Sequence, residues 1–420
     1  MNSLCKKNAY GIGMTIFVML VYCLPALSEA TQHAIVSAVA ADWGSGAHLV
    51  IDVDPVGGPR KTIKDLLPTI SDITVTSYGR YFYRIEGMDA DNVTKFDIAT
   101  PDQPIWQFST LDNTNDPSSN PQDLVFLNQS KAYLFRYGKA HAWIVNPSAN
   151  NNNEFKTGTL DLSSYGDQDG LPEMQSGVIV GDKLFIIMQR LNRNDEWIPN
   201  NTYVAVFNTN TDTEIDTGIP NNDAVNGIPI PIKNPLSIQY LSENNMIYVQ
   251  GVGKYGATWS GVPPEYSGGI IQLNPDTYNV SVILDDGDDA NHPYGQISGM
   301  MIISPAKGYF VSYAGWGDNT LYPFNPSTGE VGGAVSGLTG KNIAGMEAGT
   351  YMDKNGLLWV CNQTDSRIDI INPMDNTLDE SVDADKNPTK VVFVTLDEDI
   401  TITTNENSSG GCFISSLKEN

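Results

Sequence analysis

Short runs of alternating apolar and polar residues, rich in Tyr, Phe, Val and Ile, follow one another through most of the chain. A period of two, with β-branched and aromatic residues and no convincing amphipathic helix, predicts strands rather than helices. The runs form pairs, in which one strand leads through a polar loop to a second strand that ends in a turn. Six pairs repeat along the chain: YFYRIEG with VTKFDIATP, AYLFRYG with AWIVNP, KLFIIMQ with YVAVFNTN, MIYVQGVG with GGIIQLNP, GYFVSYAGWG with TLYPFNP, and LLWVCNQ with RIDIINP.

The repeats are spaced like the blades of a propeller. The residues that end each second strand lie between the high forties and the mid sixties apart, at Asp97, Asn146, Asn208, Asn274, Asn325 and Asn372. A further strand precedes each pair across a tight polar turn, and another follows it, as at 105–108 and 280–284. Four antiparallel strands per repeat are the composition of a propeller blade.

A seventh blade is predicted from both ends of the chain. Residues 34–66 supply three strands, in AIVSAVAADWGSG, AHLVIDVDP and the segment 61–66, but lack a first strand. The alternating segment TLDEDITITT, near 396–404, is predicted to supply it. We therefore expect an all-β fold, a seven-bladed β-propeller of four-stranded antiparallel blades. Pairing of the N- and C-terminal strands would close the ring and remove the exposed edges of an open sheet.

The two ends of the chain carry targeting and tail signals. Lys6 and Lys7 precede an apolar run, and small residues follow at 28–30, so residues 1–30 are predicted to be a cleaved signal peptide, with a membrane anchor as the alternative. Residues 31–404 are predicted to form one propeller domain, with no transmembrane segment in the mature chain. The Gly- and Ser-rich residues 405–420 are predicted to be a disordered tail, with lipidation or processing of Cys412 left open. This organisation predicts export to the periplasm, the outer cell surface or the medium.

One repeat resembles a known family. The segment LWVCNQTDSRIDIINPMDNT, residues 358–377, is similar to the repeat of YVTN-type surface and periplasmic propellers, in which an aromatic-Val-x-Asn strand precedes Ile-Asp and an Asn-Thr turn. The match is partial at 309–329 and 247–278. The resemblance implies the fold. Such propellers are mostly binding proteins with a minority of enzymes, so the function must come from the site.

Long insertions fall on one predicted face of the propeller. Loops between second and third strands, and loops between blades, share that face, and they contain most of the added residues: 167–174, 191–201, 221–234, 252–268 and 285–295. Insertions on one face often mark the binding face. Exposed aromatic rings in these loops suit recognition of a protein or a glycan, so the predicted binding residues are Trp43, Trp197, Tyr255, Trp259 and Trp316. For Trp43 and Trp316, plugging of the central channel is the alternative.

The net charge of the chain limits the classes of ligand that it can bind. Lys and Arg number 24 against 49 Asp and Glu, for a formal net charge of −25, which disfavours nucleic acid and favours cations. Two acidic loops place carboxylates at the short spacing of calcium loops, and we predict calcium at one of them, with solvated acidic turns as the alternative. The candidate ligands are Asp167, Asp169 and Glu173 in the first loop, and Asp285, Asp286, Asp288 and Asp289 in the second.

Catalytic signatures are absent from the sequence. The chain has four His and no phosphate loop, dinucleotide fingerprint, Gly-x-Ser-x-Gly elbow or haem motif. The predicted function is an exported, monomeric, non-catalytic scaffold that binds an extracellular or periplasmic protein, a glycan or a cation through one loop-rich acidic face. The alternative is a hydrolase or lyase at the mouth of the central channel. Convergent acid, base and metal ligands there would favour the enzyme, and an apolar plug would favour the scaffold.

Overall fold

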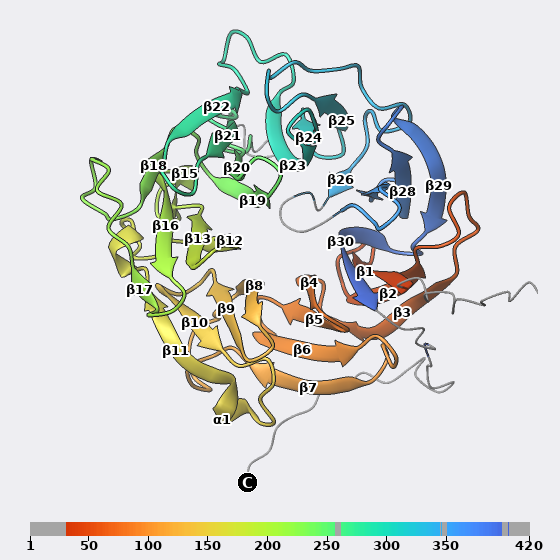
Figure 1. Ribbon diagram of the computed structural model, residues 1–420, viewed down its shortest axis with the longest axis horizontal. Helices are drawn as coiled ribbons and strands as arrows, with labels where there is room; N and C mark the ends of the chain where they lie inside the picture. The colour runs from red at the N-terminus through yellow and green to blue at the C-terminus, as the bar shows by residue number, and fades with distance from the viewer. Residues whose placement is uncertain (1–30, 257–261, 345, 347–350, 397–401, 403–420) are drawn as a thin grey trace, which may run out of the picture.

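The computed structural model describes residues 31–256, 262–344, 346, 351–396 and 402. The predictions for the signal peptide, Cys412 and the tail, and for Trp259, fall outside these residues. Seven small antiparallel sheets are arranged in a ring around a central axis (Figure 1), so the seven-bladed β-propeller is confirmed. No helix of the described residues is long and apolar enough to cross a membrane.

The first four blades follow chain order around the ring. The first combines β30 (Asn387–Leu396), β1 (Thr31–Val39), β2 (Gly46–Asp52) and β3 (Thr62–Thr69). The second contains β4 (Ile73–Tyr78), β5 (Tyr81–Glu86), β6 (Asn92–Asp97) and β7 (Pro104–Ser109). The third contains β8 (Pro121–Asn128), β9 (Lys131–Arg136), β10 (His141–Val145) and β11 (Lys156–Asp161), with the helix α1 (Asn152–Phe155) before β11. The fourth contains β12 (Met174–Val180), β13 (Lys183–Met188), β16 (Thr202–Asn208), β17 (Thr213–Glu214) and β18 (Ile228–Ile230).

The last three blades complete the ring. The fifth contains β19 (Pro235–Leu241), β20 (Met246–Gly251), β21 (Gly269–Leu273) and β22 (Val280–Leu284). The sixth contains β23 (Gln296–Ser304), β24 (Lys307–Tyr313) and β25 (Asn319–Phe324). The seventh contains β26 (Ile343–Ala344), β27 (Leu358–Asn362), β28 (Arg367–Asn372) and β29 (Thr377–Asp383). Apart from these sheets there are a 3-10 turn at Ser163–Tyr165 and a short hairpin, β14 (Leu191–Asn192) and β15 (Ile198–Pro199).

The ring closes through the two ends of the chain, but not at the residues that the sequence predicted. β1 pairs antiparallel with β30, from Thr31 opposite Leu396 to Val39 opposite Asn387. The closing strand is therefore 387–396, and the prediction of 396–404 was wrong apart from its first residue. Strands that are covered on both faces form continuous apolar runs rather than alternating ones. The run VVFV at 391–394 meets that need, with Val391 and Val394 fully buried.

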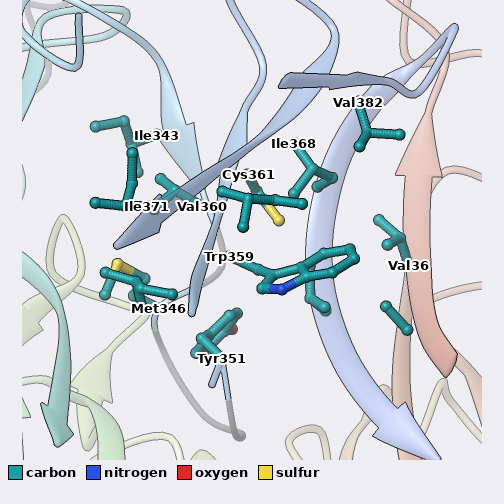
Figure 2. Packing of buried hydrophobic residues seen from close by; sticks show 14 of the residues in the cluster. Val36, Ile343, Met346, Tyr351, Trp359, Val360, Cys361, Ile368, Ile371 and Val382 are labelled. Carbon is teal, nitrogen blue, oxygen red and sulfur yellow. The ribbon is translucent and has the colours of Figure 1, made fainter. Parts of the chain in front are cut away.

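The core lies between neighbouring blades. Figure 2 shows the largest of the buried clusters, which combines residues of the first, sixth and seventh blades around Trp359. The Trp359 side chain is fully buried, donates its Nε1–H to Asp353 at 2.9 Å, and meets the ring of Phe393 on β30 edge-on. Burial of this kind on each blade face stabilises the ring, because a blade alone would expose both of its faces.

Candidate binding face and central channel

The long loops gather on one face of the ring, which we call the loop face. It consists of the loops between second and third strands, such as 40–45, 189–201 and 314–318, and the connections between blades, such as 285–295. In the second to sixth blades, by contrast, the first two strands are joined by two to four residues on the opposite face. Chain direction alone produces this division, because successive antiparallel strands end at alternate faces.

Trp43 and Trp316 form an aromatic pair on the loop face. Trp43 lies between β1 and β2 and Trp316 between β24 and β25, so they belong to blades that the seventh blade separates. Their ring centroids are 6.0 Å apart at an interplanar angle of 54°. The side chains are nevertheless 44% and 71% exposed. Neither is among the residues that line the cavities of about 170 and 400 Å³ in the central channel, and both side chains are exposed at the surface.

Tight turns fix the backbone beneath both rings. The Ala40 N–H donates to the carbonyl of Ser45 at 2.8 Å, and Trp43 adopts a left-handed φ of 59° at the tip of the turn. In the other loop the Ala314 N–H donates to the carbonyl of Asp318 at 3.1 Å, with Gly317 at a φ of 75°. Rings presented on short hydrogen-bonded turns lose little conformational entropy when a partner covers them.

Trp197 is attached to a charged cluster in the fourth blade. It lies at the tip of the hairpin β14–β15 and is 49% exposed. The guanidinium carbon of Arg193 lies 5.5 Å from the centre of its ring, at the range of a cation–π contact. Arg193 Nε also lies 3.1 Å from Glu173 and 3.7 Å from Asp169. The hairpin therefore joins one exposed aromatic ring to two of the predicted calcium ligands.

Tyr255 and Met88 add two more exposed apolar side chains to the loop face. Tyr255 lies between β20 and β21, is 38% exposed and meets Tyr313 edge-on with centroids 5.1 Å apart. Met88, between β5 and β6, is 53% exposed. Met88 is not among the binding residues predicted from the sequence, because those were all aromatic. An apolar residue inside the polar turn GMDADN was the available signal.

Glu173 is a buried carboxylate with an altered acidity. Its side chain has no exposed surface. Burial, reinforced by the nearby Asp169 carboxylate, raises the pKa of Glu173 to about 8, although Arg193 and the Leu191 N–H favour the charged form. Burial also raises the pKa of Asp167, which lies in the same loop. For Glu173, the cost of burying the charged form, together with repulsion from Asp169, therefore outweighs the ion pair with Arg193.

This burial predicts a pH dependence of stability. The pKa of Glu173 rises from 4.5 to about 8 on folding, so between these values the folded chain keeps a proton that the unfolded chain has released. The free energy of unfolding therefore falls as pH rises through that window. We expect Glu173→Gln to match the wild type near pH 5 and to exceed its stability above pH 8 by on the order of 2–4 kcal/mol. Urea unfolding across pH measures this difference.

Glu243→Gln is the matched control, since Glu243 is exposed in the turn between β19 and β20. Its stability should follow the wild-type pH curve. Parallel curves for the wild type and Glu173→Gln would show that Glu173 titrates alike in the folded and unfolded chains.

In the second acidic loop the structure buries Asp286 and leaves its neighbours at the surface. Asp286 is 1% exposed, accepts the Gly268 N–H at 3.0 Å, and has its pKa raised to about 7, chiefly by burial. Asp285 and Asp288 accept backbone N–H groups of their own turns, and Asp289 is exposed. Within the described residues no three His, Cys, Asp or Glu side chains form a group that could hold a metal ion.

Calcium binding stays a prediction. Several of these carboxylates already accept hydrogen bonds from backbone N–H groups or an Asn amide, and they would have to give up these donors to bind the cation. Asp167, for example, accepts from the Asn200 amide at 2.6 Å. A site with the affinity of extracellular modules, with Kd of about 0.1–1 mM, would stabilise the fold by about 1–3 kcal/mol at 10 mM calcium. Thermal unfolding in EDTA, calcium and magnesium measures this. A midpoint that is the same in all three would show that the loops are acidic turns.

The described residues of the central channel enclose two cavities, one with mainly polar walls and one with both polar and apolar walls. The first strand of each blade lies toward the middle of the ring (Figure 1), and the first strands of the first five blades, β30, β4, β8, β12 and β19, line two cavities of about 170 and 400 Å³. The smaller cavity begins at the loop face, where β4 and β8 start, and the larger lies farther along the same strands. The charged residues that line them are Asp72, Asp123 and Lys390. In the described part of the channel there is neither a convergent set of acid, base and metal ligands, which would favour an enzyme, nor an apolar plug, which would favour a scaffold.

Comparison with known proteins supports the fold alone. No family model and no curated protein matches the chain. Among solved structures, a Lactobacillus plantarum protein is similar with a TM-score of 0.57 and 11% identity over 87% of this chain and 99% of that one. A Bacteroides fragilis protein provisionally named a 6-phosphogluconolactonase has a TM-score of 0.56 and 12% identity, over 88% and 99%. Apo AztD from Citrobacter koseri has a TM-score of 0.50 and 11% identity, over 88% and 99%. At such identities a shared propeller does not carry function from one protein to another.

Proposed function

We propose that this chain is an exported, non-catalytic binding scaffold whose loop face docks a protein with a basic surface. The observation that carries the proposal is the distribution of exposed apolar side chains. Five blades each present one on a loop between their second and third strands: Trp43, Met88, Trp197, Tyr255 and Trp316. Among the described residues, the three Trp that are more than one-third exposed all lie on this face. Trp, Tyr and Met are enriched where proteins bind one another, and Trp and Tyr dominate binding hot spots.

Exposed carboxylates beside these anchors specify the charge of the partner. Asp42 adjoins Trp43, Asp89 adjoins Met88, and Asp195 and Asp318 lie two residues from Trp197 and Trp316; all four carboxylates are on exposed residues. With a net charge of −25 for the chain, this surface attracts a positively charged partner and accelerates its encounter. Apolar anchors surrounded by one sign of charge favour a basic protein over a neutral glycan.

Site-specific photo-crosslinking in the cells that produce the protein tests this proposal. A photoreactive residue replaces Trp316 in one variant and Met374 in the other. Met374 is 91% exposed in the turn between β28 and β29, on the opposite face. We expect one protein adduct, identified by mass spectrometry as a basic protein, from position 316 and not from position 374. A glycan adduct, or no adduct at position 316, would contradict the proposal.

Binding of the purified partner then measures the anchors. Truncating a central aromatic anchor costs about 2 kcal/mol or more, so Trp316→Ala should weaken binding about thirtyfold or more. Met374→Ala should leave the affinity within about twofold. Higher ionic strength should slow association of the wild type, because the encounter is electrostatic.

A further inference from the structure

Two oppositely charged side chains line the same two cavities of the central channel without forming an ion pair with each other. Lys390 on β30 and Asp123 on β8 come from blades that the second blade separates. Both residues line the cavity of about 170 Å³ and the cavity of about 400 Å³, and they are the only described residues that line both. The two cavities therefore meet at this pair of side chains.

Lys390 has no partner in the part of the chain that the structure describes. Every other described Lys or Arg except Lys61 makes a hydrogen bond or an ion pair, and Lys61 is on the exposed outside of the first blade. Lys390, by contrast, is partly buried in the channel. An ammonium group that has lost water without gaining an acceptor is destabilising, so the site favours a ligand that supplies an anion.

Asp123 supplies the complementary charge. It is 7% exposed and accepts the Ser176 hydroxyl at 2.6 Å and the Leu124 N–H at 2.8 Å. These neutral donors hold the carboxylate in place but leave its charge without a cation among the described residues. A buried carboxylate of this kind favours a ligand that brings a positive group.

The walls of the two cavities differ in character. The smaller cavity has polar side chains next to the charged pair, from Thr74, Gln122, Gln175 and Thr389. The larger cavity adds apolar side chains from Leu124, Val178, Ile238 and Val392, and its volume falls in the range of small-molecule sites. A ligand with a charged end and an apolar side chain matches these walls, with the charged end beside the smaller cavity and the apolar side chain in the larger one.

We infer that the central channel binds a small zwitterion with an apolar side chain, an α-amino acid or a short peptide. Its carboxylate accepts from Lys390 Nζ, its ammonium group donates to Asp123, and its apolar side chain enters the larger cavity. Charge-assisted hydrogen bonds to both ends would give each residue the oppositely charged partner that it does not have among the described residues. This site is separate from the loop face, and the inference does not depend on the proposed partner.

Titration calorimetry of the mature protein with four probes tests the inference. Leucine carries both charges, N-acetyl-leucine only the carboxylate, leucinamide only the ammonium group, and leucyl-leucine places the two charges farther apart. We expect leucine or leucyl-leucine to bind at millimolar concentration or tighter, and the tighter of the two identifies the source as an amino acid or a peptide. Loss of either charged contact should weaken binding about tenfold or more, so both singly charged probes should bind more weakly.

Substitutions test which side chain contacts which end of the ligand. Lys390→Met should weaken the zwitterion about tenfold or more without unfolding the protein, since Lys390 has no acceptor to lose among the described residues. Lys61→Met, the matched loss of an unpaired lysine outside the channel, should bind like the wild type, as should Trp316→Ala on the loop face. Asp123→Asn should weaken the zwitterion and leave N-acetyl-leucine unchanged. No binding of any probe at 10 mM, or equal affinities for the wild type and Lys390→Met, would overturn the inference.

Discussion

Trp359→Ala is expected to lower the free energy of unfolding by about 3–5 kcal/mol, the range for removal of a buried Trp. The side chain is fully buried between the seventh and first blades (Figure 2). Its loss leaves a cavity beside Phe393 and removes the Nε1–H donor of Asp353, which is itself buried. It also removes the ring face beneath the Arg60 guanidinium, whose central carbon lies 5.6 Å away. Guanidinium unfolding followed by circular dichroism measures the change.

Trp316→Ala provides the matched control, because the same residue type is 71% exposed at that position. Its effect should stay within about 0.5 kcal/mol. Trp359→Phe should fall between the two, since it keeps an aromatic ring and loses the donor to Asp353. A loss of less than about 1 kcal/mol for Trp359→Ala would show that the blades do not depend on tight packing at this contact.

Trp359 also illustrates how the fold could be predicted from the sequence. It occupies the aromatic position of the strand LWVCN. The equivalent positions in the second to sixth blades carry Tyr or Phe, all buried: Tyr83, Tyr133, Phe185, Tyr248 and Tyr309. A blade has two faces to bury, so the same periodic pattern recurs whenever a blade does. The alternation of apolar and polar residues, repeated along the chain, was therefore sufficient to predict a seven-bladed propeller.

The closing strand was misplaced for the opposite reason. The segment TLDEDITITT alternates well, which is typical of a strand with one face in water. The strand β30 lies inside the ring against β1, and Val391 and Val394 are fully buried. Alternation is therefore the wrong criterion for a strand that is covered on both faces, and the apolar run one step earlier was the better signal.

The candidate sites depend on contacts that no local pattern contains. The sequence placed Trp43 and Trp316 in loops of one face, but their 6.0 Å contact depends on where blades separated by another blade end in space. Glu173 was predicted as a cation ligand from its spacing to Asp169, whereas the structure buries it beside Arg193 from a different loop. Lys390 was not noticed, although a lysine next to the run VVFV is unusual in an inner strand.

A chain that ends after Asp385 is expected to lose its monomeric fold. The truncation removes β30, and with it the backbone partner of β1 from Thr31 to Val39. It would expose Ile35 and Val36, which are fully buried, along an unpaired strand edge. Such an edge is a template for association with other chains, so we expect aggregates by size-exclusion chromatography and a broad, weakly cooperative thermal transition.

A synthetic peptide of residues 386–396 tests whether the missing strand alone is responsible. Adding a strand to an open sheet edge uses the same backbone hydrogen bonds as the intact ring, so the peptide should restore monomers and a sharp transition in a concentration-dependent way. A peptide in which Val391 and Val394 are replaced by Asp should fail, because it would bury two unpaired charges. Rescue by both peptides would show that backbone pairing is enough to close the ring. Rescue by neither would show that closure requires the strand to be joined to the seventh blade, because a free strand must pay the entropy of association that a connected one avoids.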